Sequence, residues 1–283
     1  MGIKSFKGAL TVVTGAASGI GRAVAIAAAD EGARLLLTDI DEAGLDDVVA
    51  LIGSRGGEVL HHSAFDITDF EAVRAFADEV HERFGSVDVV MNIAGTSVWG
   101  TVENLEHRHW KKMVDVNLMG PIHVIECFVP SMIEAGRGGQ LVNVSSAAGL
   151  LALPWHAAYS AAKFGVRGVS EVLRHDLKRH RIGVSLVVPG AVRTPLVDAA
   201  EIAGFDRKDP RIQAFTRRFS AHGITPELAA KRILAGVKRN RFLVYTSFDI
   251  RFGYWWARKF APPYEYTMQK ANDYFSKVLL PPV

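Results

Sequence analysis

The chain is poor in cysteine, and this excludes several classes of protein. Its single cysteine, Cys127, leaves no intrachain disulfide, so the chain is not a small disulfide-stapled domain. The 26 glycines follow no three-residue period, which excludes a collagen-like fibre. A hydrophobic fraction of 49% is too high for a disordered chain. The 283 residues therefore predict an ordinary globular protein with a large core.

Long apolar runs and targeting signals are also missing. No uninterrupted apolar run approaches the roughly 18 residues that a membrane-spanning helix needs. The first eight residues carry Lys4 and Lys7 but then run into a strand pattern instead of a signal peptide. We expect a cytoplasmic protein.

Metal-ligand spacing is absent and the charge is uneven. His156, His175 and His180 have no ligand spacing with carboxylates or Cys127, so we predict no metal site and place these histidines on helix surfaces. The net charge is only +3, yet residues 207–259 hold thirteen basic and three acidic residues. This stretch could favour an anionic partner or surface, or it could be a solvated exterior. We expect no nucleic-acid partner.

Hydrophobic periodicity predicts a doubly wound α/β fold of Rossmann type. Short β-branched or leucine-rich runs alternate with segments of helical period, and several runs are apolar on both faces, as in a parallel sheet covered by helices on each side. The predicted strands are 10–13, 34–38, 59–64, 87–91, 140–144, 183–188 and 242–245, and the first predicted helices are 20–31, 42–52 and 70–84. We predict one domain, with residues 1–246 as the dinucleotide-binding and catalytic part and 247–283 as its helical C-terminal extension.

A glycine-rich turn joins the first predicted strand to the first predicted helix. Gly15, Gly19 and Gly21 allow a tight turn, and with Ser18 and Ile20 they bring backbone N–H groups close to a pyrophosphate. The helix N-terminus adds positive partial charge for the phosphates. Glycines also serve ordinary tight turns, but the position between strand and helix favours a cofactor loop.

Acidic residues follow the second and third predicted strands. Asp39 stands 18 residues after Gly21, where a carboxylate accepts hydrogen bonds from adenosine ribose hydroxyls and repels a 2′-phosphate. This favours NAD over NADP as the cofactor. Alternatively, Asp39 or Asp41 only caps the next helix. Asp66 is placed either beside the adenine or as a helix cap.

A tyrosine and a lysine lie one helical turn apart. Tyr159 and Lys163 share a helix face, and an ammonium close to the phenol would lower the phenol pKa toward the operating range of a general acid/base. Taken alone, such a pair is more often an ordinary feature of an amphipathic helix.

The motifs taken in order carry more information than any one of them. They are Gly15-x3-Gly19-x-Gly21, Asp66, Asn92-Ile93-Ala94-Gly95, Asn117, Asn143-Val144-Ser145-Ser146, Tyr159-x3-Lys163 and Pro189-Gly190. In this order and spacing, residues from about 8 to 245 resemble the short-chain dehydrogenase/reductase family.

The resemblance implies a role for each matching residue. Ser146, not its neighbour Ser145, would polarise the reacting oxygen, Tyr159 would exchange the proton, and Lys163 would hold the nicotinamide ribose. Asn117 would anchor a water that leads from Lys163 to solvent. The implied cofactor-binding residues are Gly15, Ser18, Gly19, Ile20, Gly21, Asp39, Asp66, Ile67, Asn92, Ala94, Gly95, Tyr159, Lys163, Pro189, Gly190, Val192 and Thr194.

The substrate is less clear from the sequence. The residues that flank the implied active site are mostly apolar or aromatic, and they suit a lipophilic secondary alcohol or ketone, although several could equally pack in a core or a subunit interface. They are Val98, Trp99, Leu150, Leu151, Leu153, Trp155 and residues 196–219. We therefore expect an NAD(H)-dependent oxidoreductase. A 3-oxoacyl thioester reductase using NADPH and a non-catalytic dinucleotide sensor remain alternatives.

An aromatic stripe marks the C-terminal extension. Phe248, Phe252, Trp255, Trp256 and Phe260 fall on one face of a predicted helix that ends before Pro262-Pro263, and a second amphipathic helix follows. We expect these helices to pack over the substrate-entry side or a neighbouring subunit of a homodimer or homotetramer. Docking on a membrane surface is the competing interpretation.

Overall fold

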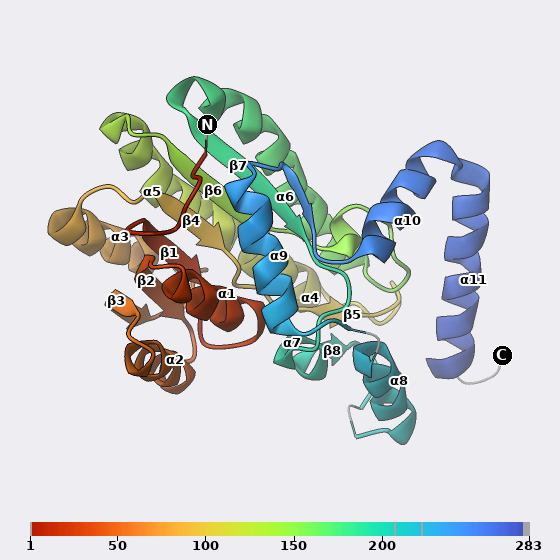
Figure 1. Ribbon diagram of the computed structural model, residues 1–283. Coiled ribbons are helices and arrows are strands. Elements are labelled where there is room, and N and C mark those ends of the chain that lie inside the picture. Colours follow the sequence, from red (N-terminus) through yellow and green to blue (C-terminus); the bar gives the residue numbers. More distant parts are fainter. Residues whose placement is uncertain (1, 207, 222, 280–283) are drawn as a thin grey trace.

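The predicted parallel sheet forms the centre of the molecule (Figure 1). The computed structural model describes residues 2–206, 208–221 and 223–279. Seven parallel strands pair in the order β3-β2-β1-β4-β6-β7-β9. Their bounds are β1 (Leu10–Thr14), β2 (Arg34–Asp39), β3 (Glu58–Ala64), β4 (Val89–Asn92), β6 (Gly139–Val144), β7 (Ile182–Val188) and β9 (Leu243–Tyr245). All seven predicted strands are present within two or three residues at each end.

Helices cover both faces of this sheet, and strand alternation divides the core between them. On one face, β1 contributes Val13 to a cluster with α1 (Gly19–Asp30), α2 (Glu42–Ser54) and α9 (Pro226–Lys238). On the other face, Val12 of β1 packs toward α3 (Phe70–Phe84) and α5 (Gly120–Ala135). Neighbouring residues of one strand thus serve opposite cores, and the doubly wound fold predicted from the sequence is confirmed.

One long helical run passes beneath the sheet. It consists of α4 (His107–Val114), a π-helical turn η1 (Asp115–Met119) and α5. Among the described residues it is the one helix that is long and apolar enough to cross a membrane, with 39% of its most apolar window buried in the protein. Val124, Phe128 and Met132 are buried against the sheet. We therefore interpret it as a core helix of the fold.

Short elements between the main strands form a second layer near one end of the sheet. β5 (Val98–Trp99) pairs in parallel with β8 (Glu201–Ile202), next to α7 (Pro195–Ala199) and α8 (Pro210–Ala221). The 3₁₀ turn η2 (Ala147–Gly149) precedes α6 (Ala157–Asp176), which ends in a second 3₁₀ turn, η3 (Leu177–His180). The sequence did not predict β5 or β8, because two residues are too few to show a period.

The C-terminal extension forms the two expected helices but buries a different face. They are α10 (Phe248–Lys259) and α11 (Ala261–Leu279), which begins at the two prolines, while residues 280–283 lie outside the described residues. The aromatic stripe of α10 faces away from this chain's own core, with Phe248, Phe252 and Trp255 76%, 51% and 51% exposed, so it does not pack over the substrate-entry side within the chain, and its contact with a neighbouring subunit stays a prediction. The opposite face, with Ile250, Tyr254 and Ala257, packs on the core beside β7.

Candidate active site

The glycine-rich turn between β1 and α1 is built from close backbone approaches. Gly15 has a φ of +69°, and a Cβ there would lie 2.7 Å from the Cα of Ala94. A Cβ at Gly21 would lie 1.8 Å from the Gly15 carbonyl oxygen. Gly19 has a φ of +53°, and a Cβ there would lie 3.2 Å from the Thr194 side chain. The turn needs glycine at all three positions, and it brings residues 15–21, 94 and 194 together.

The first turn of α1 has no side-chain cap. Ser18 is the N-cap residue, but its side chain accepts no hydrogen bond from the following backbone N–H groups, and no acidic residue lies in the first turn that starts at Gly19 and Ile20. These N–H groups and the positive end of the helix dipole thus have no anionic partner within the helix. This arrangement fits a pyrophosphate group.

Asp39 is held at the end of β2 by the glycine-rich turn. Its Oδ2 accepts a hydrogen bond from the Ala17 N–H at 2.9 Å, and Oδ1 accepts one from the Asp41 N–H at 3.1 Å. The cap of α2 is Asp41, whose side chain accepts from Gly44. Asp39 itself is therefore not the helix cap and keeps acceptor positions beside the loop.

After β3, as after β2, the helix cap and the candidate cofactor-binding aspartate are two different residues. Asp69 caps α3 by accepting from the N–H groups of Glu71 and Ala72. The Asp66 side chain accepts from the Thr68 N–H, at 2.9 Å, and from no N–H group of α3. The alternative that Asp66 caps the helix is therefore wrong. Ile67 is buried, and its carbonyl oxygen lies 3.0 Å from His123 Nδ1.

At the end of β4, Asn92 is bonded within the core, and the residues after it are held against the cofactor turn. The buried Asn92 amide donates to Asn143 Oδ1 at 2.9 Å and to the Pro121 carbonyl at 3.3 Å, so both its donors act within the core. Thr14 Oγ1 accepts from the N–H groups of Ile93 and Ala94 at 3.0 and 3.1 Å. The sequence did not single out Thr14, which fixes this segment against the cofactor turn.

Ser146 and Tyr159 lie together, and Ser145 is turned away. The Ser146 hydroxyl lies near enough to the Tyr159 phenol to lower its pKa, and it accepts a hydrogen bond from the Ala148 N–H at 3.1 Å. The Ser145 hydroxyl instead donates to the Lys163 carbonyl at 2.9 Å, where it supports α6. Of the two neighbouring serines, only Ser146 therefore lies near the phenol.

Lys163 lies one turn after Tyr159 in a buried environment. Its Nζ donates to the Val144 carbonyl at 3.0 Å and lies 5.8 Å from the centroid of the Tyr159 ring. Burial lowers the pKa of Lys163 to about 8. Lys163 therefore loses its proton more readily than an exposed lysine does, and a hydrogen-bond acceptor close to Nζ would stabilise the charged ammonium.

Asn117 is placed by the π-helical turn η1. Its side chain accepts from the Thr96 N–H at 3.1 Å and donates to the Thr96 carbonyl at 2.9 Å. Gly95 separates it from Lys163: a Cβ on Gly95 would lie 2.8 Å from Asn117 Oδ1 and 3.5 Å from Lys163 Nζ. The irregular turn therefore brings Asn117, Gly95 and Lys163 into one group.

The pKa of the Tyr159 phenol is shifted opposite to the expected direction. Burial raises this pKa, and the nearby Ser146 hydroxyl only partly opposes the shift. The expectation that Lys163 lowers it is therefore not met in the protein alone, because Nζ donates to the Val144 carbonyl and the phenol is desolvated. The phenol is protonated at neutral pH.

The segment after β7 faces the cofactor turn. The Pro189 carbonyl accepts from the Ala147 N–H at 2.8 Å, and the Gly190 N–H donates to Thr246 Oγ1 at 3.3 Å. Val192 is buried and bridges to Ile224. This segment therefore connects the Ser146 turn to Thr194, which lies across from Gly19.

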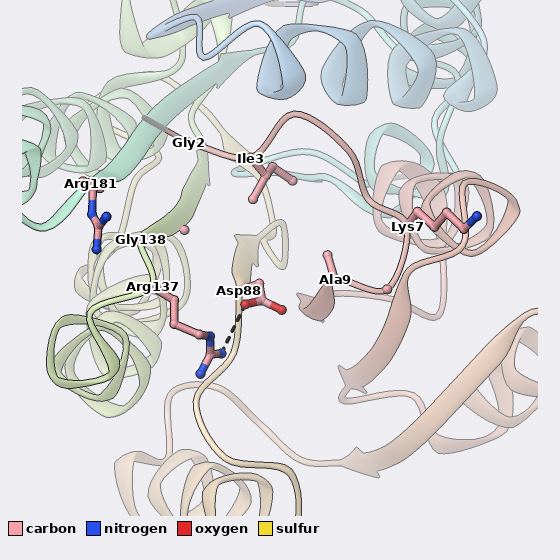
Figure 2. A pocket seen from close by; sticks show the side chains of 10 residues that line it. Gly2, Ile3, Lys7, Ala9, Asp88, Arg137, Gly138 and Arg181 are labelled. Atoms are coloured by element: carbon pink, nitrogen blue, oxygen red, sulfur yellow. Dashed lines mark hydrogen bonds and ion pairs between the residues drawn. The ribbon is translucent and has the colours of Figure 1, made fainter.

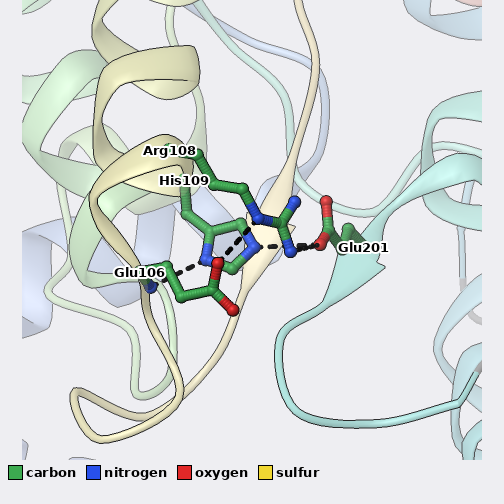
Figure 3. Close-up of polar contacts among 4 residues, drawn as sticks. All are labelled: Glu106, Arg108, His109 and Glu201. Carbon is green, nitrogen blue, oxygen red and sulfur yellow. Dashed lines mark hydrogen bonds and ion pairs between the residues drawn. The ribbon is translucent and has the colours of Figure 1, made fainter.

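A polar cluster that the sequence did not indicate holds β8 on α4 (Figure 3). Glu201 Oε1 lies 2.9 Å from His109 Nε2 and 2.8 Å from Arg108 Nη2. The Glu106 N–H donates to His109 Nδ1 at 2.9 Å, so neutral His109 carries its proton on Nε2 and donates it to Glu201. The one sequence signal was the Glu106-x-x-His109 capping spacing.

A shallow depression lies at the other edge of the sheet (Figure 2). It is lined by Asp88, Gly138 and Arg181, which precede β4, β6 and β7, so it lies away from the Tyr159 site. Arg137 at its rim pairs with Asp88 at 3.2 Å. Within the described part of the chain, no cluster of His, Cys, Asp or Glu could hold a metal ion.

Comparison with known proteins identifies the family. Residues 9–202 match the short chain dehydrogenase family. The chain belongs to this family. The oxidoreductase SadH of Mycobacterium tuberculosis is 37% identical over 251 residues, 88% of this chain and 90% of SadH. A D-threitol dehydrogenase of Mycolicibacterium smegmatis is 38% identical over 191 residues, 67% of this chain and 72% of that enzyme.

Solved structures of the short-chain dehydrogenase/reductase family share this fold. A Burkholderia phymatum member in complex with NAD superimposes with a TM-score of 0.83, at 30% identity over 92% of this chain and 96% of its own. A metagenomic member in complex with NADP has a TM-score of 0.68, at 30% identity over 85% and 96%. The chain is thus an oxidoreductase of a family that acts on CH–OH groups with a nicotinamide dinucleotide.

Proposed function

We propose that the protein is an NAD(H)-dependent oxidoreductase that interconverts a lipophilic secondary alcohol and the corresponding ketone. The observation that carries this proposal is the group formed by the half-buried Ser146 and the buried Tyr159, Lys163 and Asn117 at the carboxyl ends of the central strands. A titratable phenol beside a hydroxyl and an ammonium is the set that proton exchange at a carbinol oxygen needs.

Tyr159 moves the proton in this mechanism. During reduction its phenol donates the Oη proton to the carbonyl oxygen, and during oxidation the phenolate takes the proton from the alcohol. The bound nicotinamide supplies or accepts the hydride. The Ser146 hydroxyl, which lies near the phenol, would hold the substrate oxygen in place for this exchange.

Lys163 and Asn117 support Tyr159. Lys163 would hold the nicotinamide ribose, whose hydroxyl oxygens stabilise the charged ammonium that burial disfavours. A cation beside the phenol then favours phenolate during oxidation. Asn117, packed against the same glycine as Lys163, would hold a water that returns the proton to solvent.

The remaining predicted residues hold the dinucleotide. The glycine-rich turn and the α1 N-terminus would bind the pyrophosphate, and Asp39 would bind the adenosine ribose. Asp66, Ile67 and the segment after β4 would line the adenosine, and residues 189–194 the nicotinamide. A carboxylate at Asp39 repels a 2′-phosphate, which supports NAD(H) over NADP(H).

Apolar walls support a lipophilic substrate. Leu150, Leu151 and Leu153 are buried or half-buried between Tyr159 and the C-terminal extension. The experiment is a panel of ketones, sterols, retinoids and acyl thioesters assayed separately with NADH and NADPH. Turnover of lipophilic ketones with NADH supports the proposal. Turnover of 3-oxoacyl thioesters with NADPH would favour the reductase alternative, and dinucleotide binding without any turnover would favour a sensor.

Assembly concerns the exposed face of α10. The rings of Phe248, Phe252, Trp255 and Phe260 contact one another in sequence along this helix. An exposed aromatic row of this kind supports contact with a second subunit in a cytoplasmic homodimer or homotetramer. Light scattering tests this assembly. A monomer that binds anionic vesicles through this face would instead support the membrane interpretation.

A further inference from the structure

Two tryptophans lie in one buried cluster, and only one of them has a hydrogen-bond partner. Trp99 Nε1 donates to Ser97 Oγ at 2.7 Å. Trp155 Nε1 is buried and donates to no group among the described residues, although the residue is only 7% exposed. A buried indole N–H without an acceptor is costly, so such groups are rare in folded proteins.

The backbone at Trp155 is also unusual. Its φ of +65° lies in the left-handed region, which a bulky side chain rarely adopts outside functional sites. The conformation is fixed on both sides: the Trp155 carbonyl accepts from the Gly100 N–H at 2.8 Å, and the next residue, His156, is the N-cap of α6. The strain therefore serves to place this indole.

Trp155 lies close to the reacting phenol along the chain, and the His156 ring lies between their two clusters. It precedes Tyr159 by four residues, and the intervening His156 ring lies 6.2 Å from the Tyr159 ring and 5.0 Å from the Trp99 ring. The sequence placed His156 on a helix surface, but it is buried here. Val98 belongs to the cluster with Tyr159 and its strand neighbour Trp99 to the cluster with Trp155, so β5 contributes one side chain to each of two clusters on its opposite faces.

Three distant segments meet at the Trp155 ring. Phe205, which follows β8, stacks on it at 5.9 Å between centroids, and Phe275 of α11 meets it edge-on at 6.4 Å. The extension is fixed there by polar contacts: the Ala152 N–H donates to Tyr264 Oη, and Arg218 of α8 donates to Tyr274 Oη, both at 3.1 Å. Helix α11 thus lies beside α8 at the C-terminal side of the molecule (Figure 1).

We propose that Trp155, Phe205 and Phe275 form a distal subsite for the substrate, in which Trp155 Nε1 donates a hydrogen bond to an acceptor oxygen remote from the reacting carbon. This inference rests on the proposed function and narrows its substrate class. The substrate is an aryl-bearing alcohol or ketone with a second oxygen on the part that enters between these three rings.

The test compares two ketones of matched size. Benzylacetone is prepared with a ring methoxy group, in each of the three ring positions, or with a ring ethyl group of similar length. Trp155→Phe removes the N–H and keeps an aromatic ring, and Trp99→Phe is the matched control because the Trp99 N–H already has Ser97 as acceptor.

We expect Trp155→Phe to raise the KM of at least one methoxy ketone by about three- to tenfold, the value of one neutral hydrogen bond, and to leave the ethyl ketones nearly unchanged. Trp99→Phe should show no contrast between the two series. Equal effects of Trp155→Phe on both series would overturn the subsite and leave the proposed function intact.

Binding to the NAD⁺ complex, which holds no hydride to transfer to a ketone, is read from the shift in melting temperature and gives the same contrast without turnover. If the wild-type complex binds none of these ketones, the subsite is wrong. Phe275→Ala gives a second test that does not depend on whether the Trp155 variant folds. It should raise the KM of both ketone series, and Phe275→Leu should restore part of the lost affinity for them. The affinity for NADH should not change in either variant. An unchanged KM in Phe275→Ala would also contradict the subsite.

Discussion

The cofactor side and the substrate side of the molecule are built in different ways. Around the glycine-rich turn, local backbone contacts define the geometry: Gly15 approaches Ala94, and Ala17 holds Asp39. On the substrate side, side chains from three distant segments meet around Trp155, and a buried N–H has no partner among the described residues.

This difference explains what each side contributes. Close backbone packing tolerates few residues other than glycine, so substitutions in such a turn rarely change the class of ligand that it binds. Contacts between side-chain rings can be exchanged without rebuilding the backbone, so the substrate side can vary. We infer that the cofactor half serves a common chemistry, while the extension and the segment around β8 select the substrate. Four predictions test this division.

Removing residues 247–283 should have the largest effect. The deletion uncovers Leu150, Leu151 and Val188, which pack against Ile250 and Tyr254. We expect lower solubility or a less ordered oligomer, and a KM for lipophilic ketones raised by about tenfold or more, the scale of about 1.4 kcal/mol. NADH affinity, measured by fluorescence titration, should change much less.

The opposite result would show that the extension is not part of the substrate site. If the truncated protein keeps its assembly, solubility and KM but stops binding anionic vesicles, α10 and α11 form a membrane-contact element instead.

The buried Lys163 should make stability depend on pH. Its pKa is about 8 in the folded protein and 10.5 when unfolded, so the unfolded chain binds more protons between these values. The free energy of unfolding should therefore rise with pH through this window, by at most about 3 kcal/mol. Tyr159, with a raised pKa, opposes this trend only above about pH 10.

The measurement is denaturant unfolding of the cofactor-free protein against pH, for wild type and Lys163→Met. The difference between the two proteins should shrink or change sign as pH increases from 8 toward 10.5. Parallel curves would show that Lys163 is not held in a desolvated environment.

Asp39→Ala should change cofactor preference without changing chemistry. Removing the carboxylate removes the repulsion of a 2′-phosphate, so the ratio of kcat/KM with NADH to that with NADPH should fall by about tenfold. Asp41→Ala is the matched control, because Asp41 caps α2 and should affect only stability. A wild type that prefers NADPH tenfold would contradict the role given to Asp39.

The smallest effect is expected at the cluster that holds β8 on α4. Glu201→Gln keeps an acceptor for His109 Nε2 but loses the charge that faces Arg108. We expect about 0.5–1 kcal/mol lower stability, because Arg108 is largely exposed. The KM for ketones should increase slightly with NADH affinity unchanged. Loss of NADH affinity would argue against the separation of the two sides.

The sequence predicted the cofactor side better than the substrate side. Local periodicity located all seven main strands and placed the glycine-rich turn between a strand and a helix, while Ser146 and the role of Tyr159 came from the family resemblance of the motifs taken in order. The sequence left open which aspartates cap the helices after β2 and β3, because the answer depends on where each side chain points. The structure assigns the caps to Asp41 and Asp69.

Long-range contacts were outside the reach of the sequence. Helix α10 is apolar on two faces, and nothing local shows that Ile250 and Tyr254, not Phe252 and Trp255, contact the core. The meeting of Trp155 with Phe275 joins residues more than a hundred positions apart, which no periodicity reveals. The same holds for the desolvation that raises the Tyr159 pKa.

The most direct test of the central claim compares hydride transfer and cofactor binding in Tyr159→Phe. This variant keeps the ring and removes the proton that the mechanism moves. We expect turnover of an active ketone with NADH to fall by about 10² or more, the scale of general acid/base catalysis, while NADH affinity stays close to that of the wild type. Turnover equal to the wild type would show that Tyr159 is not the proton donor and would contradict the proposed mechanism.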